Sequence, residues 1–227
     1  MTARDNVVER FKIAVTSSLK NHDELVLALF GKKRQASLET VLVEQFVLST
    51  TVTWESFLND LFVAYIEMKP KICLDSLEKR IEDSIKTKFG KTVARLIKFN
   101  RPTELTPSKI AALVDPDGRN LSLSSASKIA SRANEMLASE FARRFALDEA
   151  DGAFVDFSVA LRNYLGHESK KARTSLSEAH VRLSGQKNEA FLAPISNLGK
   201  FLKEKDAAGY SRAKRHALRL VEIASVL

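Results

Sequence analysis

One uninterrupted segment constrains the fold of this chain more than any other feature, because no glycine or proline occurs between Lys32 and Lys69. A Ser-Leu-Glu-Thr sequence at 37–40 precedes an apolar run, as at the N-terminus of a helix. The β-branched residues at 47–53 are compatible with a strand, but the length without a turn signal favours a helix. A helix that is apolar on all sides is buried, so we expect this one at the centre of the molecule. Its apolar positions are Val41, Leu42, Val43, Phe46, Val47, Leu48, Val52, Trp54, Phe57, Leu58, Leu61, Phe62 and Tyr65.

Helical periodicity extends over most of the remaining chain, whereas no segment of useful length alternates between polar and apolar residues as a strand does. Three of the five prolines, at 102, 107 and 116, indicate an irregular insert at about 99–121. We expect an all-α up-and-down bundle in a single domain over 1–227, with additional helices or a helical insertion and with basic helices at 186–227. The helices are expected at 4–29, 41–66, 73–89, 122–146, 151–165, 172–184, 187–203 and 206–227.

The composition excludes several classes of protein. At 227 residues and 44% apolar content, the chain is long enough to bury one good-sized core or two small ones. The single cysteine, Cys73, excludes an internal disulfide, and no Cys/His cluster has the spacing of a zinc site, so we expect no metal and no cofactor. The longest uncharged apolar stretch, QFVLSTTVTW, is too short to span a bilayer. A cytoplasmic protein without a membrane partner is expected.

The net charge of +8 is concentrated in one part of the chain. From Arg162 to Arg219 there are 13 Lys and Arg against 5 Asp and Glu, whereas the rest of the chain has 23 of each. Such a local surplus favours a polyanionic partner, with nucleic acid ahead of an anionic membrane, although a solvated helix face is the plain alternative. The C-terminal YSRAKRHALRLVEIASVL fits either a binding surface or an amphipathic closing helix of the bundle.

The stretch LRNYLGHESKK, residues 161–171, contains the strongest candidate site. Cleaving RNA without a metal needs a group that titrates near neutrality, which His167 supplies, and a fixed cationic fork for the scissile phosphate, which Arg162 supplies. Asn163 would orient them. In a uniform helix five residues separate Arg162 and His167 by about 140°, but Gly166 is expected to take the left-handed conformation that ends helices. His167 would then turn back toward Arg162 or toward its symmetry mate.

Flanking residues extend this candidate site. Lys170, Lys171 and Arg173 are expected to bind neighbouring RNA phosphates, with a steep dependence on salt. A competing pair, Arg173 and His180, lacks the asparagine and the glycine, and its seven-residue offset would place both side chains on one exposed helix face. The plain alternative is that Arg162 and His167 are ordinary residues of a helix end.

The remaining residues that could carry chemistry are interpreted as structural or solvent-exposed. Trp54 is expected in the core, and Cys73 as a small buried hydrophobic residue. Glu55 is interpreted as a flank carboxylate or the partner of a salt bridge rather than as a catalytic group. His22 and His216 are expected to face solvent.

The RNxxxH arrangement at Arg162–His167 resembles the R-x4-6-H motif of the HEPN superfamily. The segment VLSTTVTWESFLNDLFVAYI is similar to the Trp-Glu helix of its RiboL-PSP-HEPN-like branch, and the resemblance covers roughly residues 36–185. It implies a four- or five-helix bundle that dimerises through the motif and cleaves RNA without metal, leaving a 2′,3′-cyclic phosphate and a 5′-hydroxyl. It also implies a toxin–antitoxin or anti-phage setting, with a restraining partner protein.

The motif departs from the family pattern beside the histidine. Gly166 stands where many relatives have alanine, and Glu168-Ser169 follow where relatives have glycine or x-Tyr. Two alternatives therefore accompany the nuclease hypothesis. One is an inactive HEPN-like scaffold or sensor that dimerises and binds nucleic acid or a partner protein, and the other is a basic helical DNA-binding protein without a helix-turn-helix signature.

Overall fold

A computed structural model describes residues 2–101, 105–114, 124–186, 191 and 195–227 of the chain. Within these ranges the secondary structure is helical and contains no β-strand; Lys205 and Ser211 form an isolated antiparallel bridge. The predicted all-α class is therefore confirmed. None of the described helices is long and apolar enough to cross a membrane.

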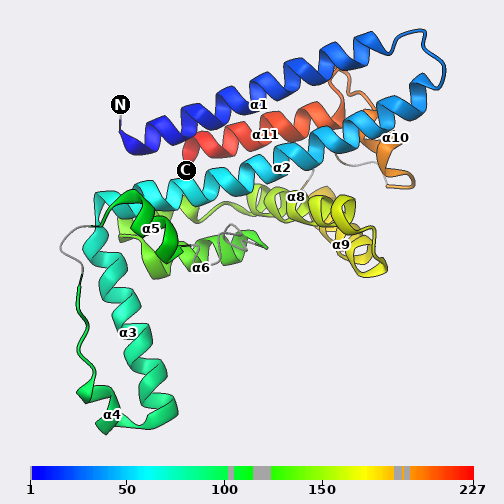
Figure 1. The fold of residues 1–227 in the computed structure, drawn as a ribbon. Helices are drawn as coiled ribbons and strands as arrows, with labels where there is room; N and C mark the ends of the chain where they lie inside the picture. The colour runs from blue at the N-terminus through cyan, green and yellow to red at the C-terminus, as the bar shows by residue number, and fades with distance from the viewer. Residues whose placement is uncertain (1, 102–104, 115–123, 187–190, 192–194) are drawn as a thin grey trace.

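The expected central helix is α2, which spans Gln35–Met68. It pairs with α1 (Ala3–Ala28) as an antiparallel hairpin, and α11 (Arg212–Val226) packs against both (Figure 1). Trp54 is 1% exposed and meets the ring of Phe11 edge-on, so its interpretation as a core residue is confirmed. The buried hydroxyls of Thr50 and Thr51 in this apolar helix donate to carbonyls one turn earlier, so these two hydroxyls are not left unpaired.

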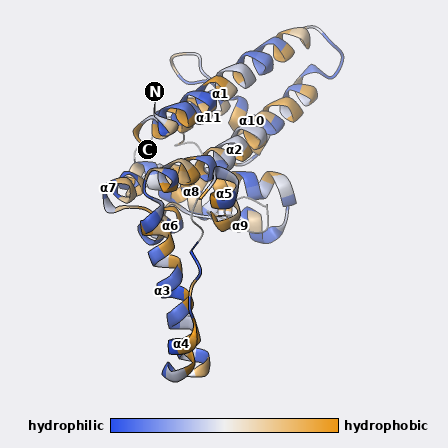
Figure 2. Cartoon of the chain, turned by 60° about the vertical axis from the view of Figure 1, so that its left-hand side comes forward, coloured by the Kyte–Doolittle hydropathy of each residue, from blue (hydrophilic) through white to orange (hydrophobic). Residues whose placement is uncertain are grey.

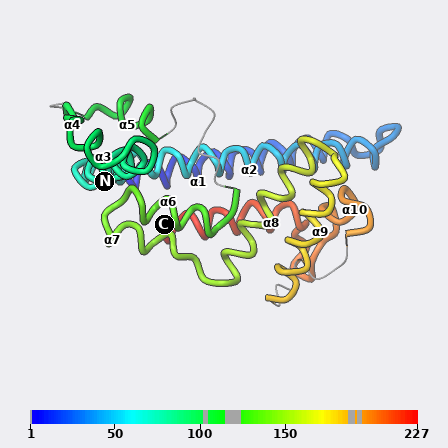
Figure 3. Tube along the Cα trace, turned by 90° about the horizontal axis from the view of Figure 1, so that it is seen from below, coloured from blue at the N-terminus to red at the C-terminus, as the bar shows by residue number. Residues whose placement is uncertain are grey.

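A second group of helices covers the other side of α2. α8 (Glu149–His167) packs against α2 and against α9 (Lys170–Gly185), which lies across its end (Figures 1 and 3). The short α10 (Leu198–Lys203) also reaches α2. A Cβ atom on Gly199 would overlap the Thr40 side chain, so only glycine permits this close approach.

The central helix begins at Gln35, six residues before its expected start, and three other predicted helices also differ from the structure. The segment 122–146 divides into α6 (Ala126–Met136), α7 (Ser139–Ala142) and a 3₁₀ turn, because Leu137 and Ala138 adopt extended backbone and bury their side chains. Within the predicted helix 187–203, α10 (Leu198–Lys203) is capped by Asn197, whereas residues 187–190 and 192–194 lie outside the described ranges. The predicted helix 206–227 begins at Arg212, after a turn in which Gly209 has a left-handed φ of 80°.

The expected irregular insert at 99–121 contains a helix, α5 (Pro107–Val114). Ile110 and Val114 are buried and α5 packs on α2, so apolar contact overrides the proline signal here. Proline fits the first position of a helix because that residue needs no amide donor. Residues 102–104 and 115–123, where the rest of the insert and the start of the helix 122–146 were predicted, lie outside the described ranges.

A helical arm extends away from these helices. α3 (Pro70–Phe89) leaves the end of α2, and α4 (Lys91–Leu96) lies at its far end (Figures 1 and 2). The predicted helix 73–89 is confirmed, with an earlier start at Pro70. Cys73 is the one buried residue of α3, as its interpretation required.

Candidate functional site

The helix that carries the RNxxxH motif does not break at Gly166. α8 continues through His167, and the left-handed residue is Glu168, whose φ is 45°. The predicted break is therefore wrong. Ser169 must be extended to cap α9, where its hydroxyl accepts from the amide of Ala172, so the reversal falls on Glu168. Because the helix is uniform, His167 points about 140° away from Arg162 within one chain.

The side chain of Arg162 extends from α8 to Glu55 on α2. Its Nη1 donates to Asn163 Oδ1 over 2.9 Å, and its Nη2 lies 3.5 Å from Glu55 Oε2. Burial raises the pKa of the Glu55 carboxyl, and the charge of Arg162 partly opposes that rise. The interpretation of Glu55 as a salt-bridge partner is confirmed. The Arg162 side chain stays 35% exposed, so part of its guanidinium faces solvent.

The remaining predicted site residues lie around the corner between α8 and α9. His167 is the exposed last residue of α8, and Lys170 and Lys171 are exposed in the first turn of α9. Neither lysine forms an ion pair within the described part of the chain, and no acidic residue occupies that turn. The positive end of the α9 dipole adds to these two charges, which makes the corner locally cationic.

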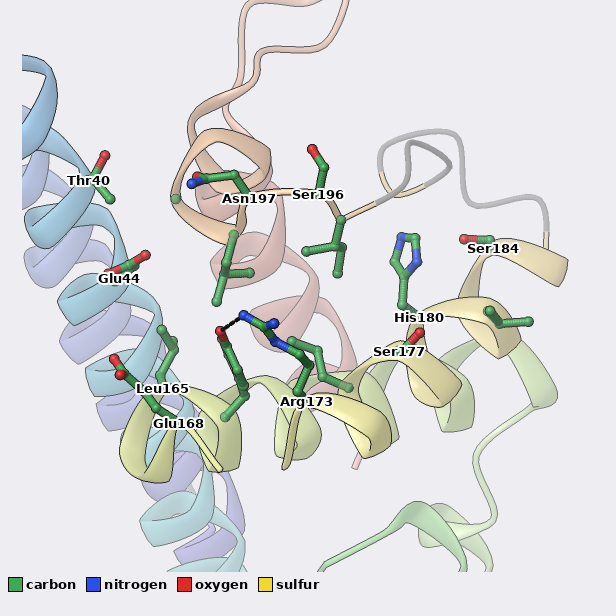
Figure 4. A pocket seen from close by; sticks show the side chains of 16 residues that line it. Thr40, Glu44, Leu165, Glu168, Arg173, Ser177, His180, Ser184, Ser196 and Asn197 are labelled. Atoms are coloured by element: carbon green, nitrogen blue, oxygen red, sulfur yellow. Dashed lines mark hydrogen bonds between the residues drawn. The ribbon is translucent and has the colours of Figure 1, made fainter. Parts of the chain in front are cut away.

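A pocket of about 750 Å³ opens beside this corner, between the end of α8, α9, α2 and the approach to α10 (Figure 4). Arg173 projects into it, and its Nη2 donates to the Tyr164 hydroxyl over 3.3 Å. The polar side chains of the lining include Thr40, Glu44, Tyr164, Glu168, Arg173, His180 and Asn197. Of the predicted site residues, only Arg173 lines this pocket.

Glu44 is a pocket residue that the sequence analysis missed. Burial raises the pKa of its carboxyl and the nearby charge of Glu168 raises it further, while Lys203 opposes both. Glu44 and Glu55 are eleven residues apart, which is three helical turns, so both lie on one side of α2. Two carboxylates at that spacing in a largely apolar helix could have indicated, from the sequence alone, a polar side of α2 that faces α8 and α9.

Three histidines do not lie where the sequence placed them. His180 is 8% exposed and its Nε2 lies 2.8 Å from the carbonyl oxygen of Phe191, so the predicted exposed face for Arg173 and His180 is wrong. His216 is completely buried, with its Nε2 3.0 Å from Ser158 Oγ. The His22 side chain is 13% exposed and its ring packs on Phe46. The expectation that His22 and His216 face solvent is wrong.

Part of the C-terminal positive charge is neutralised within the fold. Arg212 pairs with Glu204, Arg215 with Asp206, and Arg219 with Asp151 and Glu222. α11 buries one face against α1 and α2, which confirms the interpretation as an amphipathic closing helix. The exposed cations beside the motif are therefore the better candidates for contact with a polyanion.

Comparisons of this chain with models of known families, with curated proteins and with solved structures found no match. Within the described ranges, no three His, Cys, Asp or Glu side chains converge as metal ligands.

Proposed function

We propose that this protein is a metal-independent endoribonuclease that acts in the cytoplasm as a homodimer. The observation that carries the proposal is the corner between α8 and α9, where an exposed imidazole, a partly exposed guanidinium and three exposed cations fall within residues 162–173. Histidine suits proton transfer near neutral pH, and arginine suits a phosphate.

A second copy of the chain is needed because one chain keeps Arg162 and His167 on different sides of α8. In the proposed dimer, Arg162 of one copy and His167 of the other contact the same scissile phosphate. The 2′-hydroxyl loses its proton to the neutral His167 imidazole of one copy and attacks phosphorus, the bond to O5′ breaks, and that oxygen receives a proton from the protonated His167 imidazole of the other copy. The products are a 2′,3′-cyclic phosphate and a 5′-hydroxyl.

Arg162 can bind a phosphate while it keeps its intramolecular contacts. Its guanidinium has five N–H donors; Asn163 accepts from Nη1 and Glu55 pairs with Nη2, which leaves further donors for a phosphate. Asn163 then orients the guanidinium, and Lys170, Lys171 and Arg173 hold flanking phosphates. The resemblance to HEPN proteins supports a role in a toxin–antitoxin or anti-phage system, with a partner protein that restrains the nuclease.

The test is RNA cleavage by the purified protein in EDTA. Wild type is expected to cleave mixed RNA, and Arg162→Ala or His167→Ala is expected to reduce the rate at least about a hundredfold. Arg182→Ala is the matched control, because Arg182 is an exposed arginine of α9 that pairs with Asp156. An inert wild type, or cleavage that survives both changes, would refute the proposal, and cleavage that EDTA abolishes would indicate a metal site instead.

A second candidate function is a HEPN-like scaffold or sensor that binds RNA or a partner protein without cleaving it. One observation favours it: Glu55 and Asn163 already hold Arg162, and His167 faces elsewhere. Sedimentation and RNA binding distinguish the two candidates. A dimer that binds RNA, loses affinity with Lys170→Gln/Lys171→Gln and releases no product would support the scaffold.

A further inference from the structure

The arm, residues 70–101, has few contacts with the rest of the chain that the structure describes. α3 and α4 contain one buried residue each, Cys73 near the base and Ala94 near the tip. After α4 the chain returns along α3, where Arg101 Nη2 lies 2.7 Å from Asp75 Oδ1 and 2.6 Å from Glu78 Oε2. These ion pairs join the returning segment to α3, so the tip is held away from the body (Figures 1 and 2).

The arm tip, residues 86–99, exposes a group of large apolar side chains. Leu96 is 77% exposed and Phe89 is 66% exposed. Isolated exposed apolar residues are ordinary, but a contiguous group of them marks an interaction surface. The group comprises Phe89, Val93, Leu96, Ile97 and Phe99.

All charged side chains of the arm tip are positive. No acidic residue occurs from Ser84 to Arg101, whereas this stretch contains six Lys and Arg. Lys86 pairs with Glu82 and Asp83 at the edge of the tip. Within the described ranges the other cations of the tip form no ion pair, namely Lys88, Lys91, Arg95 and Lys98.

We propose that the arm tip docks on the surface of an anionic lipid bilayer. Apolar side chains interleaved with Lys and Arg are the pattern that lies at a membrane interface, where apolar groups enter the acyl boundary and cations meet lipid headgroups. The protein would lie on the membrane without crossing it, in keeping with the lack of a spanning helix among the described ones. This docking goes beyond the expectation of no membrane partner, and it does not depend on nuclease activity.

Other binding partners would explain fewer features of the arm tip than a bilayer does. RNA would pair with the cations and stack bases on Phe89 and Phe99, but it would leave the aliphatic Val93, Leu96 and Ile97 in water. The tip of a second copy would bring cations against cations. A bilayer accommodates both the aliphatic and the aromatic side chains as well as the charges.

Flotation of the full-length protein with lipid vesicles tests this proposal. The protein is expected to float with vesicles of phosphatidylcholine and phosphatidylglycerol, and far less with phosphatidylcholine alone. Phe89→Ser/Leu96→Ser is expected to weaken partitioning roughly ten- to a hundredfold. Lys91→Gln/Lys98→Gln is expected to weaken it roughly thirtyfold. All four side chains are exposed, so thermal unfolding should stay unchanged.

Phe30→Ser is the matched control. Phe30 is 82% exposed in the turn between α1 and α2, beside Lys32, Lys33 and Arg34, but acidic Asp23, Glu24 and Glu39 flank that turn. Its flotation should equal that of wild type. A wild type that stays unbound, tip variants that still float, or loss of flotation with Phe30→Ser alone would each overturn the assignment. Loss of RNA binding in the tip variants, without any flotation by wild type, would assign the tip to RNA.

Discussion

Of the four histidines in the chain, only His167 has an exposed side chain. His180 and His216 are buried, and His22 is largely covered by Phe46 and its neighbours. A histidine that transfers protons to a polymer must reach the polymer, so burial leaves His167 as the one candidate for that chemistry. Its role in cleavage stays a prediction.

His216 should make the stability of the fold depend on pH. Burial lowers its pKa from 6.5 to about 4, and its Nδ1 has no hydrogen-bond partner among the described residues. The unfolded chain therefore binds the proton more tightly, so stability falls as pH drops from about 6.5 toward 4. Between pH 7 and pH 5 the wild type should lose about 2 kcal/mol more than His216→Gln, measured by urea unfolding. Equal losses in the two proteins would contradict this assignment.

The environment of His216 could have been predicted in part. Basic neighbours in RAKRHALRL favoured an exposed position, but Ala213, Ala217 and Leu220 share its helix face at spacings of three and four. Apolar residues at that period indicate a buried helix face, which α11 packs against α1 and α2. Its partner Ser158 lies 58 residues earlier in the chain, and no local pattern links the two.

At the scale of elements, helical periodicity predicted most of the helices, and their ends were less predictable. α2 follows from its apolar composition, whereas the break at Leu137–Ala138 arises because tertiary burial outweighs local propensity. At the end of α8, glycine favoured a stop at Gly166, but the cap of α9 sets the turn at Glu168. The separation of Arg162 from His167 follows from that single difference.

Two glycine substitutions test these element boundaries. Gly166→Ala should stabilise the protein by about 0.5 kcal/mol, because a helical position with open space around it prefers alanine. Gly199→Ala should destabilise it by about 1–3 kcal/mol, because the new methyl group would overlap Thr40 on α2. Urea unfolding measures both. Destabilisation by Gly166→Ala would instead support a left-handed glycine that ends α8.

At the scale of the whole molecule, the positions of charged residues in the fold indicate binding surfaces better than the net charge does. Several C-terminal cations are engaged in ion pairs, whereas the remaining chain, which has equal numbers of acidic and basic residues, contains the cationic arm tip. Whether a cation is buried or paired depends on tertiary contacts. Residue counts therefore could not distinguish the paired cations near the C-terminus from the cations of the arm tip. The up-and-down arrangement of a HEPN bundle also stays a prediction.

The arm should be the least protected helical part of the chain. Amides of α4 and the outer half of α3 are expected to exchange with deuterium at least about a hundredfold faster than those in the middle of α2, because few buried contacts resist their opening. Hydrogen exchange read by mass spectrometry measures the ratio. Equal protection of the two regions would mean that the arm is covered in solution.

The position of α11 has a consequence for how the chain is made. Its buried face completes the groove between α1 and α2, and the Tyr65 hydroxyl donates to the carbonyl of Leu227. α2 ends at Met68 and α11 begins at Arg212. At about 5–20 residues per second, the ribosome needs on the order of ten seconds to deliver that partner. During this interval the apolar faces of α1 and α2 that α11 later covers remain exposed, and the nascent protein is then most dependent on chaperones.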